Sequence, residues 1–197
     1  MKRGLIALLL GITALLSQPT LAQGYGSERI APALALQQRV DALTGYLARH
    51  PETSAGEVRA FLDDAIAPLF DFDQMAYLVA GPINRYLSPN QRPRFVASFR
   101  DIFLDTIASR LAGISVGSVV YLPPRGNPAQ GRVNLALQVI GNGVAVQLDF
   151  KLVEGRNGWR IIDISANGIS AVGYFRQHMS NLVREQGLPA LLNRMGR

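Results

Sequence analysis

The spacing of the apolar residues changes at Gly113, and this change constrains the fold more than any other feature of the sequence. Before Gly113, apolar residues recur every three or four positions, which is typical of helices with one buried face. After Gly113 they alternate with polar residues, as in half-buried strands. Helical spacing returns from Ala171. The order of helices, sheet and helices predicts a single α+β domain.

The first two helices are marked by sequence signals at their ends. One is predicted over Glu28 to His50 and ends before Pro51. The next begins at Ser54, because Ser54 and Glu57 form a capping box. Pro68 is expected to kink or end this second helix.

Two further helices precede Gly113. Asp71 predicts the cap of a short helix that ends at Gly81. The longest helix begins at Ser88 or at Asn90. Asn90 is favoured because Pro93 then lies in the first turn, where its missing N–H is not needed.

Four antiparallel strands are predicted after Gly113. The first covers Ser115 to Leu122 and is followed by a loop from Pro123 to Gln130, and the fourth runs from Trp159 to Ile164. The middle two are joined by the turn Gly141-Asn142-Gly143. Their apolar faces consist of Val133, Leu135, Leu137 and Val139, and of Val144, Val146, Leu148, Phe150 and Leu152. The tail is predicted to form two helices broken by Gly187 and Pro189.

The first 22 residues are predicted to be a cleaved signal peptide. Lys2 and Arg3 precede an apolar run, and Thr20-Leu21-Ala22 fits a cleavage site. The run is too short to cross a bilayer comfortably. We therefore expect residues 1–22 to be removed, residues 23–197 to form one domain, and the protein to be exported.

Motifs for catalysis and nucleotide binding are absent from the sequence. It has no P-loop, no dinucleotide fingerprint and no G-x-S-x-G, and it has no cysteine and only two histidines, His50 and His178. We predict no catalytic residue, no metal site and no disulfide. The formal charge of +6 comes mainly from arginines spaced along helices, which disfavours nucleic acid and is compatible with an anionic lipid headgroup.

The long helix and the middle strands carry many large apolar residues, and no catalytic or binding motif in the sequence accounts for them. From periodicity alone, an ordinary packed core is favoured over a ligand cavity.

Four segments carry a family resemblance: FDFDQMAYLVAG, SPNQRPRFVASFRDIF, NGWRIIDISANGISAVGYFRQHMSNLV and GLPALLNRM. In order and spacing they resemble the MlaC family, also called toluene-tolerance proteins. The resemblance implies a twisted antiparallel sheet, similar to that of nuclear transport factor 2, covered by helices that leave an apolar pocket for acyl chains. One departure is Pro82 to Asn84, where family members often have an aromatic residue.

The resemblance also implies a function. Members of the MlaC family are periplasmic phospholipid carriers that maintain outer-membrane lipid asymmetry. The implied partners are phospholipid, an inner-membrane ABC-transporter complex with its substrate-binding membrane component, and an outer-membrane lipoprotein complex. We expect a monomer without cofactor, with phospholipid as its cargo.

The residues expected at the lipid follow from the predicted faces and from apolarity. They are Met75, Phe99, Phe103, Leu135, Leu137, Val146, Leu148, Phe150, Ile164 and Tyr174. Core filling is the equal alternative for Met75. Arg176 is a candidate for headgroup contact, with an ion pair or a docking contact as alternatives.

Three other functions remain open at this stage. Hopanoid-associated proteins share the family pattern, so the cargo could be another apolar lipid. A cone-fold isomerase or dehydratase would use Asp163 or Asp149 as a base and Tyr174 as a donor. A docking module with a solid core would use the arginines of the C-terminal helices.

Overall fold

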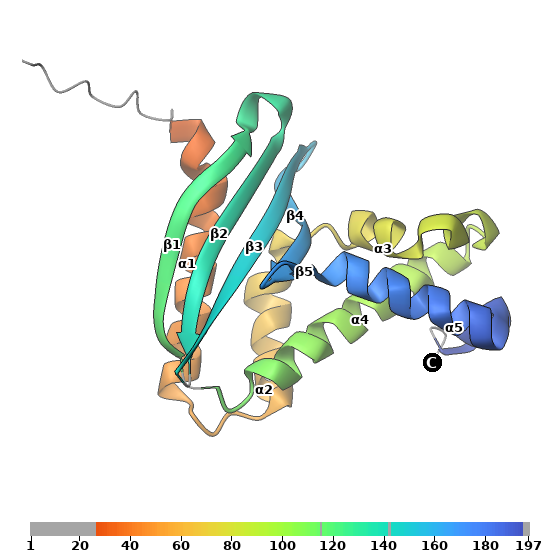
Figure 1. Ribbon diagram of the computed structural model, residues 1–197, viewed down its shortest axis with the longest axis horizontal. Helices are drawn as coiled ribbons and strands as arrows, with labels where there is room; N and C mark the ends of the chain where they lie inside the picture. The colour runs from red at the N-terminus through yellow and green to blue at the C-terminus, as the bar shows by residue number, and fades with distance from the viewer. Residues whose placement is uncertain (1–26, 115, 142, 195–197) are drawn as a thin grey trace, which may run out of the picture.

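The computed structural model describes residues 27–114, 116–141 and 143–194 (Figure 1). The predicted signal peptide lies outside these residues, as do Ser115, Asn142 and Met195 of the predicted elements. The helices are α1 (Ser27–Arg49), α2 (Ala55–Phe61), η1 (Leu62–Ile66), η2 (Ala67–Leu69), α3 (Phe72–Ala80), η3 (Gly81–Tyr86), α4 (Gln91–Leu111), η4 (Pro128–Gln130) and α5 (Ala171–Arg194). The strands are β1 (Val116–Asn127), β2 (Arg132–Gly141), β3 (Val144–Gly155), β4 (Gly158–Ala166) and β5 (Ile169–Ser170).

The predicted helix starts are confirmed by their capping contacts. Ser54 Oγ accepts a hydrogen bond from the Glu57 N–H, and the Ser54 N–H donates to the Glu57 carboxylate at 2.8 Å. The Asp71 carboxylate accepts from the Gln74 N–H at 2.8 Å. Asn90 is the N-cap of α4, so Pro93 lies in the first turn as expected.

The helix that starts after Ser54 is α-helical only to Phe61, and its last turn ends at Leu69, one residue after Pro68. After Phe61 it continues as one π-helical turn and one 3-10 turn, and Pro68 lies in the latter. Gly187 interrupts α5 with a φ of 79°, so the tail consists of two helical segments, as predicted.

The sheet confirms the predicted apolar faces of the middle strands. Leu135 pairs with Phe150 and Leu137 with Leu148, which places both apolar sets on one side of the sheet. The described strands form an antiparallel sheet in the order β1-β2-β3-β4-β5, with the short β5 beyond the four predicted strands. Asn167 (φ 48°) and Gly168 (φ 82°) make the turn into β5.

One prediction about β1 is wrong. The expected loop from Pro123 instead continues the strand to Asn127, and only Pro128–Gln130 leave it. Proline lacks the N–H that a central strand needs, but β1 lies at the sheet edge. The register shifts between Leu122 and Arg125, so the two prolines occupy a bulge.

Two regions of packed helices flank the sheet. Figure 1 shows α1 and α2 against one face of the sheet, while α3, α4 and α5 form a helical lobe beyond the β4 side. The Asp71 N–H donates to the Ile161 carbonyl at 2.9 Å and connects the chain before α3 to β4. The lobe core contains an aromatic cluster of Phe70, Phe72, Phe99, Phe103 and Phe175, whose neighbouring ring centroids lie 5.4 to 6.4 Å apart.

The junction between the sheet and α5 is held by a buried carboxylate. Asp163 on β4 is 5% exposed and accepts hydrogen bonds from Ser170 Oγ at 2.7 Å and from the Val172 N–H at 3.2 Å. Ser170 Oγ in turn accepts from the Gly173 N–H at 3.0 Å. The first turn of α5 is therefore capped from the sheet, which sets the direction in which the helical lobe leaves it.

Candidate functional site

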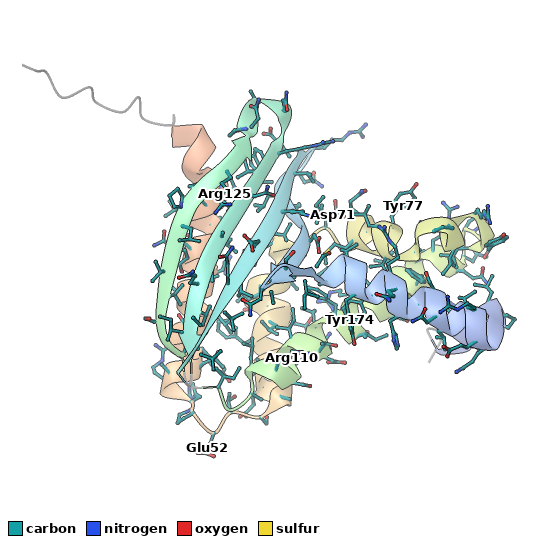
Figure 2. All side chains as sticks on the ribbon, in the orientation of Figure 1. Glu52, Asp71, Tyr77, Arg110, Arg125 and Tyr174 are labelled. Carbon is teal, nitrogen blue, oxygen red and sulfur yellow. The ribbon has the colours of Figure 1, made fainter. Side chains whose placement is uncertain are left out.

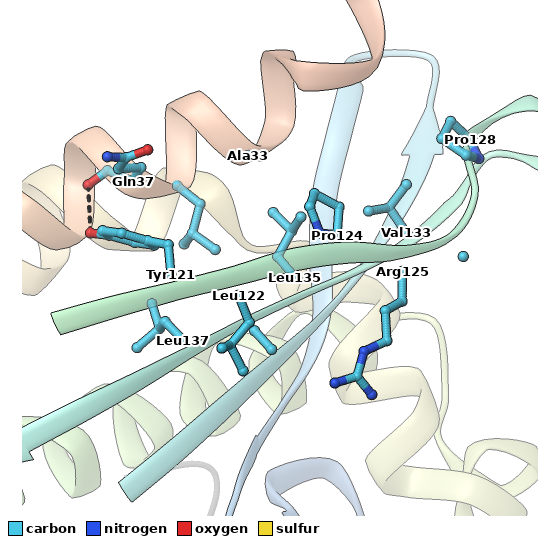
Figure 3. A pocket seen from close by; sticks show the side chains of 13 residues that line it. Ala33, Gln37, Tyr121, Leu122, Pro124, Arg125, Pro128, Val133, Leu135 and Leu137 are labelled. Atoms are coloured by element: carbon cyan, nitrogen blue, oxygen red, sulfur yellow. Dashed lines mark hydrogen bonds between the residues drawn. The ribbon is translucent and has the colours of Figure 1, made fainter. Parts of the chain in front are cut away.

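An apolar pocket of about 390 Å³ lies between α1 and the β1–β2 hairpin (Figure 3). Its lining comes from one helix and two neighbouring strands. The residues are Ala33, Leu36, Gln37, Tyr121, Leu122, Pro124, Arg125, Gly126, Pro128, Val133, Leu135, Ala136 and Leu137.

The helical wall of the pocket is formed by Ala33, Leu36 and Gln37, and the first two begin an apolar stripe along α1. Ala33, Leu36, Val40, Leu43 and Leu47 follow one another at three- and four-residue intervals, so they share one side of the helix. Leu36 is 6% exposed, whereas Leu34, on the other side, is 51% exposed. Only one side of α1 is therefore available to cover the sheet.

The sheet wall is formed by alternate residues of β2 and by Tyr121 of β1. Val133, Leu135 and Leu137 are buried and point to the same side of β2. Tyr121 pairs with Leu137 and points toward α1 in Figure 3. The bulge places Pro124 beside Leu135, so a proline without an N–H completes this wall.

The Tyr121 hydroxyl connects the two walls. It donates to the Asp41 carboxylate at 2.5 Å and lies 3.3 Å from the Gln37 carbonyl oxygen, both on α1. Burial, and then the hydrogen bond to Asp41, raise the pKa of Tyr121. The phenol therefore stays neutral and remains a donor that holds α1 against β1.

The pocket lining contains no carboxylate. Within the described residues, no group of three or more His, Cys, Asp or Glu side chains could hold a metal ion. Such a lining suits the burial of hydrocarbon and provides no general base.

Two of the predicted lipid contacts, Leu135 and Leu137, line this pocket. Four others, namely Val146, Leu148, Phe150 and Ile164, lie on the same side of the next two strands, outside the lining. They continue the apolar surface of Leu135 and Leu137 across the sheet.

The predicted residues Met75, Phe99 and Phe103 lie elsewhere. All three are almost completely buried, with at most 1% exposure, and belong to the core of the helical lobe. Phe99 and Phe103 contact Phe72 and Phe175 in the aromatic cluster rather than lining the pocket beside α1.

Tyr174, which was expected at the lipid, lies outside the pocket lining. Tyr174 is 57% exposed and stacks on His178 at the surface of α5 (Figure 2). The buried stripe of α5 runs instead through Val172, Phe175 and Met179, because these residues share one side of the helix.

Arg176 has a local partner in the helical lobe. Its Nε donates to the Leu78 carbonyl oxygen at 2.7 Å, near the end of α3. The nearby departure from the family pattern is also built into the lobe, because Ile83 is buried and Asn84 Nδ2 donates to the Tyr77 carbonyl at 2.7 Å.

Most of the pocket lining was not identified from the sequence. The apolar spacing before Gly113 predicts helices with one buried face, but it does not indicate a cavity rather than a packed contact beside α1. Tyr121 was assigned to a strand without a partner, and the lining residues Pro124, Arg125 and Gly126 were expected in a loop. The register opposite Leu137 is what brings Tyr121 to α1.

A family model described as "MlaC protein" matches residues 37–197. The chain belongs to the MlaC family. A phospholipid-binding protein from Ralstonia solanacearum, solved in complex with a phospholipid, has a similar fold, with a TM-score of 0.73 and 21% sequence identity. The match covers 82% of this MlaC-family chain and 93% of the Ralstonia chain. Among curated proteins, none matches the sequence. No helix in the part of the chain that the structure describes is long and apolar enough to cross a membrane.

Proposed function

We propose that this MlaC-family protein is a soluble periplasmic carrier that binds phospholipid by its acyl chains between α1 and the sheet. The observation that supports the proposal most directly is the apolar pocket of about 390 Å³, which contains no carboxylate. The family match supports the same proposal, and the Ralstonia protein of similar fold is a phospholipid-binding protein.

The energy of acyl-chain burial explains why such a carrier needs a dry pocket. Transfer of roughly 30 methylenes out of water at about 0.8 kcal/mol each gives on the order of 25 kcal/mol. Release into water would be far too slow for transport. Exchange between a bilayer and an equally apolar pocket is close to neutral, so cargo can move in either direction when an apolar path is open.

Loading is proposed to enlarge the pocket. Its volume of about 390 Å³ lies near the lower end of the range of roughly 300 to 1,000 Å³ that is typical of small-ligand sites. We expect α1 to move outward, so that acyl chains extend from Leu135 and Leu137 toward Leu148 and Phe150. We assign Phe99, Phe103 and Met75 to the core of the lobe in this proposal.

The positions of the Asp163 and Asp149 carboxylates support an enzyme less well than they support a carrier. Asp163 is occupied by the cap of α5, and Asp149 accepts two hydrogen bonds from Gln147 Nε2 at 3.0 and 3.1 Å. Neither belongs to the pocket lining. A base in the pocket is what an isomerase or dehydratase would require.

The transport role extends the proposal to partners. We propose exchange of lipid with an inner-membrane ABC-transporter complex and an outer-membrane lipoprotein complex, in support of outer-membrane lipid asymmetry. The chain has no nucleotide-binding motif, so the energy that sets the direction would come from the transporter.

The test is the cargo of the native protein. The full chain is expressed with its N-terminal segment, purified gently, extracted with solvent and analysed by mass spectrometry. We expect about one phospholipid per chain. A hopanoid would correct the lipid class, and protein that is folded and free of lipid would contradict the proposal.

A further inference from the structure

Four arginines gather at one end of the sheet. Arg125 and Arg132 flank the β1–β2 connection, while Arg156 lies in the turn from β3 to β4 and Arg160 follows it on β4. Figure 1 shows both connections at the same end of the sheet, beside the start of α1. In residues 123–132 and 153–160 the only acidic side chain is Glu154.

The strand register places three of these arginines on one face. Arg132 on β2 and Arg160 on β4 both pair with Val153 on β3, so they are two strand spacings apart, about 10 Å. Arg125 pairs with Asn134, two residues from Arg132, and therefore shares that face. Arg156 extends the group into the turn.

Ion pairing distinguishes these arginines from others whose side chains the structure describes. Arg59 and Arg100 are neutralised by Asp63, Asp101 and Asp105 between α2 and α4. No carboxylate among the side chains that the structure describes, those of residues 31–114, 116–141 and 143–191, pairs with the four arginines at the sheet end. Arg160 Nη1 donates a hydrogen bond to the adjacent Trp159 carbonyl at 2.9 Å.

The charged end adjoins the opening of the apolar pocket. Arg125, Gly126 and Pro128 belong both to this end and to the pocket lining. Figure 3 shows the Arg125 guanidinium pointing away from α1, out of the pocket. The charge of Arg125 therefore stands at the rim, and the interior remains apolar.

We propose that this arginine-rich end of the sheet docks on the surface of bilayers that contain anionic phospholipids, and so brings the pocket rim to the headgroups. Unpaired charges spread over about 10 Å of a sheet face fit a surface of many phosphates better than one enclosed ligand. Guanidinium groups bind phosphate oxygens in a forked geometry. The inference rests on the proposed carrier function, because docking is useful only if the pocket exchanges lipid.

The test is sedimentation of the full chain with vesicles of phosphatidylcholine, with and without phosphatidylglycerol. Arg132, Arg156 and Arg160 are changed to Gln, and Arg125 is kept because it lines the pocket. The matched control changes Arg49, Arg94 and Arg110 to Gln. It removes the same charge from exposed arginines elsewhere, which also lack ion pairs among the described residues.

The wild type is expected to bind the anionic vesicles, and added salt should release it. Each basic residue near an anionic surface raises partitioning about fivefold, so the sheet-end variant should bind about 100-fold more weakly while the control binds almost normally. Equal loss in both variants, or no binding of the wild type to anionic vesicles, would overturn docking; the second result would favour an acidic protein as the partner of this end.

Lipid extracted from the same preparations separates the two proposals. The sheet-end variant should keep its bound phospholipid, because none of its three changes lies in the pocket lining. Protein that binds anionic vesicles but carries no lipid would refute the carrier function and leave docking intact. Protein that carries lipid but does not bind anionic vesicles would refute docking and leave the carrier function intact.

Discussion

Replacement of Leu36 by Lys should empty the pocket while the protein remains folded. Leu36 is 6% exposed and belongs to the α1 wall of the pocket. Burial of a leucine side chain stabilises a protein by about 1.5–3 kcal/mol. Because the pocket opens to solvent beside exposed Gln37, the lysine can extend its ammonium group to water. The free energy of unfolding should therefore fall by about 2–3 kcal/mol.

The expected loss can be read in two assays. For a chain of 197 residues, 1 kcal/mol corresponds to about 2–4 °C, so thermal unfolding should occur roughly 4–12 °C lower. Acyl chains that fill the pocket would bury an unpaired ammonium group, which carries a penalty of several kcal/mol. Since about 1.4 kcal/mol is a factor of ten, the lipid recovered per chain should fall about 100-fold or more.

Leu34→Lys is the matched control. It makes the same change two residues away on the same helix, at a side chain that is 51% exposed. Its stability should change by less than about 0.5 kcal/mol, and its lipid content should stay normal. Full lipid content in folded Leu36→Lys, or equal loss in both variants, would refute the placement of acyl chains beside α1.

Three other substitutions test the supporting structure. Phe103→Ala should lower the free energy of unfolding by about 3–5 kcal/mol in chemical denaturation, yet leave the lipid per folded chain unchanged. Loss of lipid without destabilisation would show instead that Phe103 contacts the lipid. Tyr121→Phe should lower the free energy of unfolding by about 1–2 kcal/mol. Because the pKa of Tyr121 is raised in the folded protein, the unfolded chain loses the phenol proton near pH 10 while the folded chain keeps it. The free energy of unfolding of the wild type should therefore fall above about pH 10, and that of Tyr121→Phe should fall less. Parallel plots of the free energy of unfolding against pH for the two proteins would contradict this. Asp163→Ala should lower the free energy of unfolding by about 2–3 kcal/mol, because two hydrogen bonds at the start of α5 are lost, and a variant of wild-type stability in urea would count against that role.

Local features of the fold could be predicted because they depend on neighbouring residues. Ser54 with Glu57 and Asp71 with Gln74 carry their capping signal within three residues, and both caps form as expected. The register of β2 with β3 follows from their matched alternation and the short turn between them. Pro123 and Pro124 misled the prediction of β1, because their tolerance in a strand depends on its place at the sheet edge.

The pocket depends on contacts between distant segments, which alternation does not specify. Leu135 and Leu137 were placed on the correct face, but that pattern does not say which helix covers them. The spacing of the aromatic residues of α4 fits a cavity wall as well as a packed core. They are packed by Phe70 and Phe72, just before and at the start of α3, and by Phe175 of α5. Tyr174 and Phe175 are adjacent in sequence, and only the packing of α5 shows that Phe175 is the buried one.

The location of the bound lipid is the central claim, and photo-crosslinking from α1 tests it most directly. Gln37 lines the pocket, whereas the neighbouring Gln38 is exposed and does not. A benzophenone amino acid is incorporated at one position or the other, the full chain is purified with its native cargo and irradiated, and intact-protein mass spectrometry detects any added lipid. Crosslinking of phospholipid from position 37 and little from position 38 is the predicted result. Lipid that crosslinks equally from both positions, or from neither while remaining bound, would contradict a site between α1 and the β1–β2 hairpin.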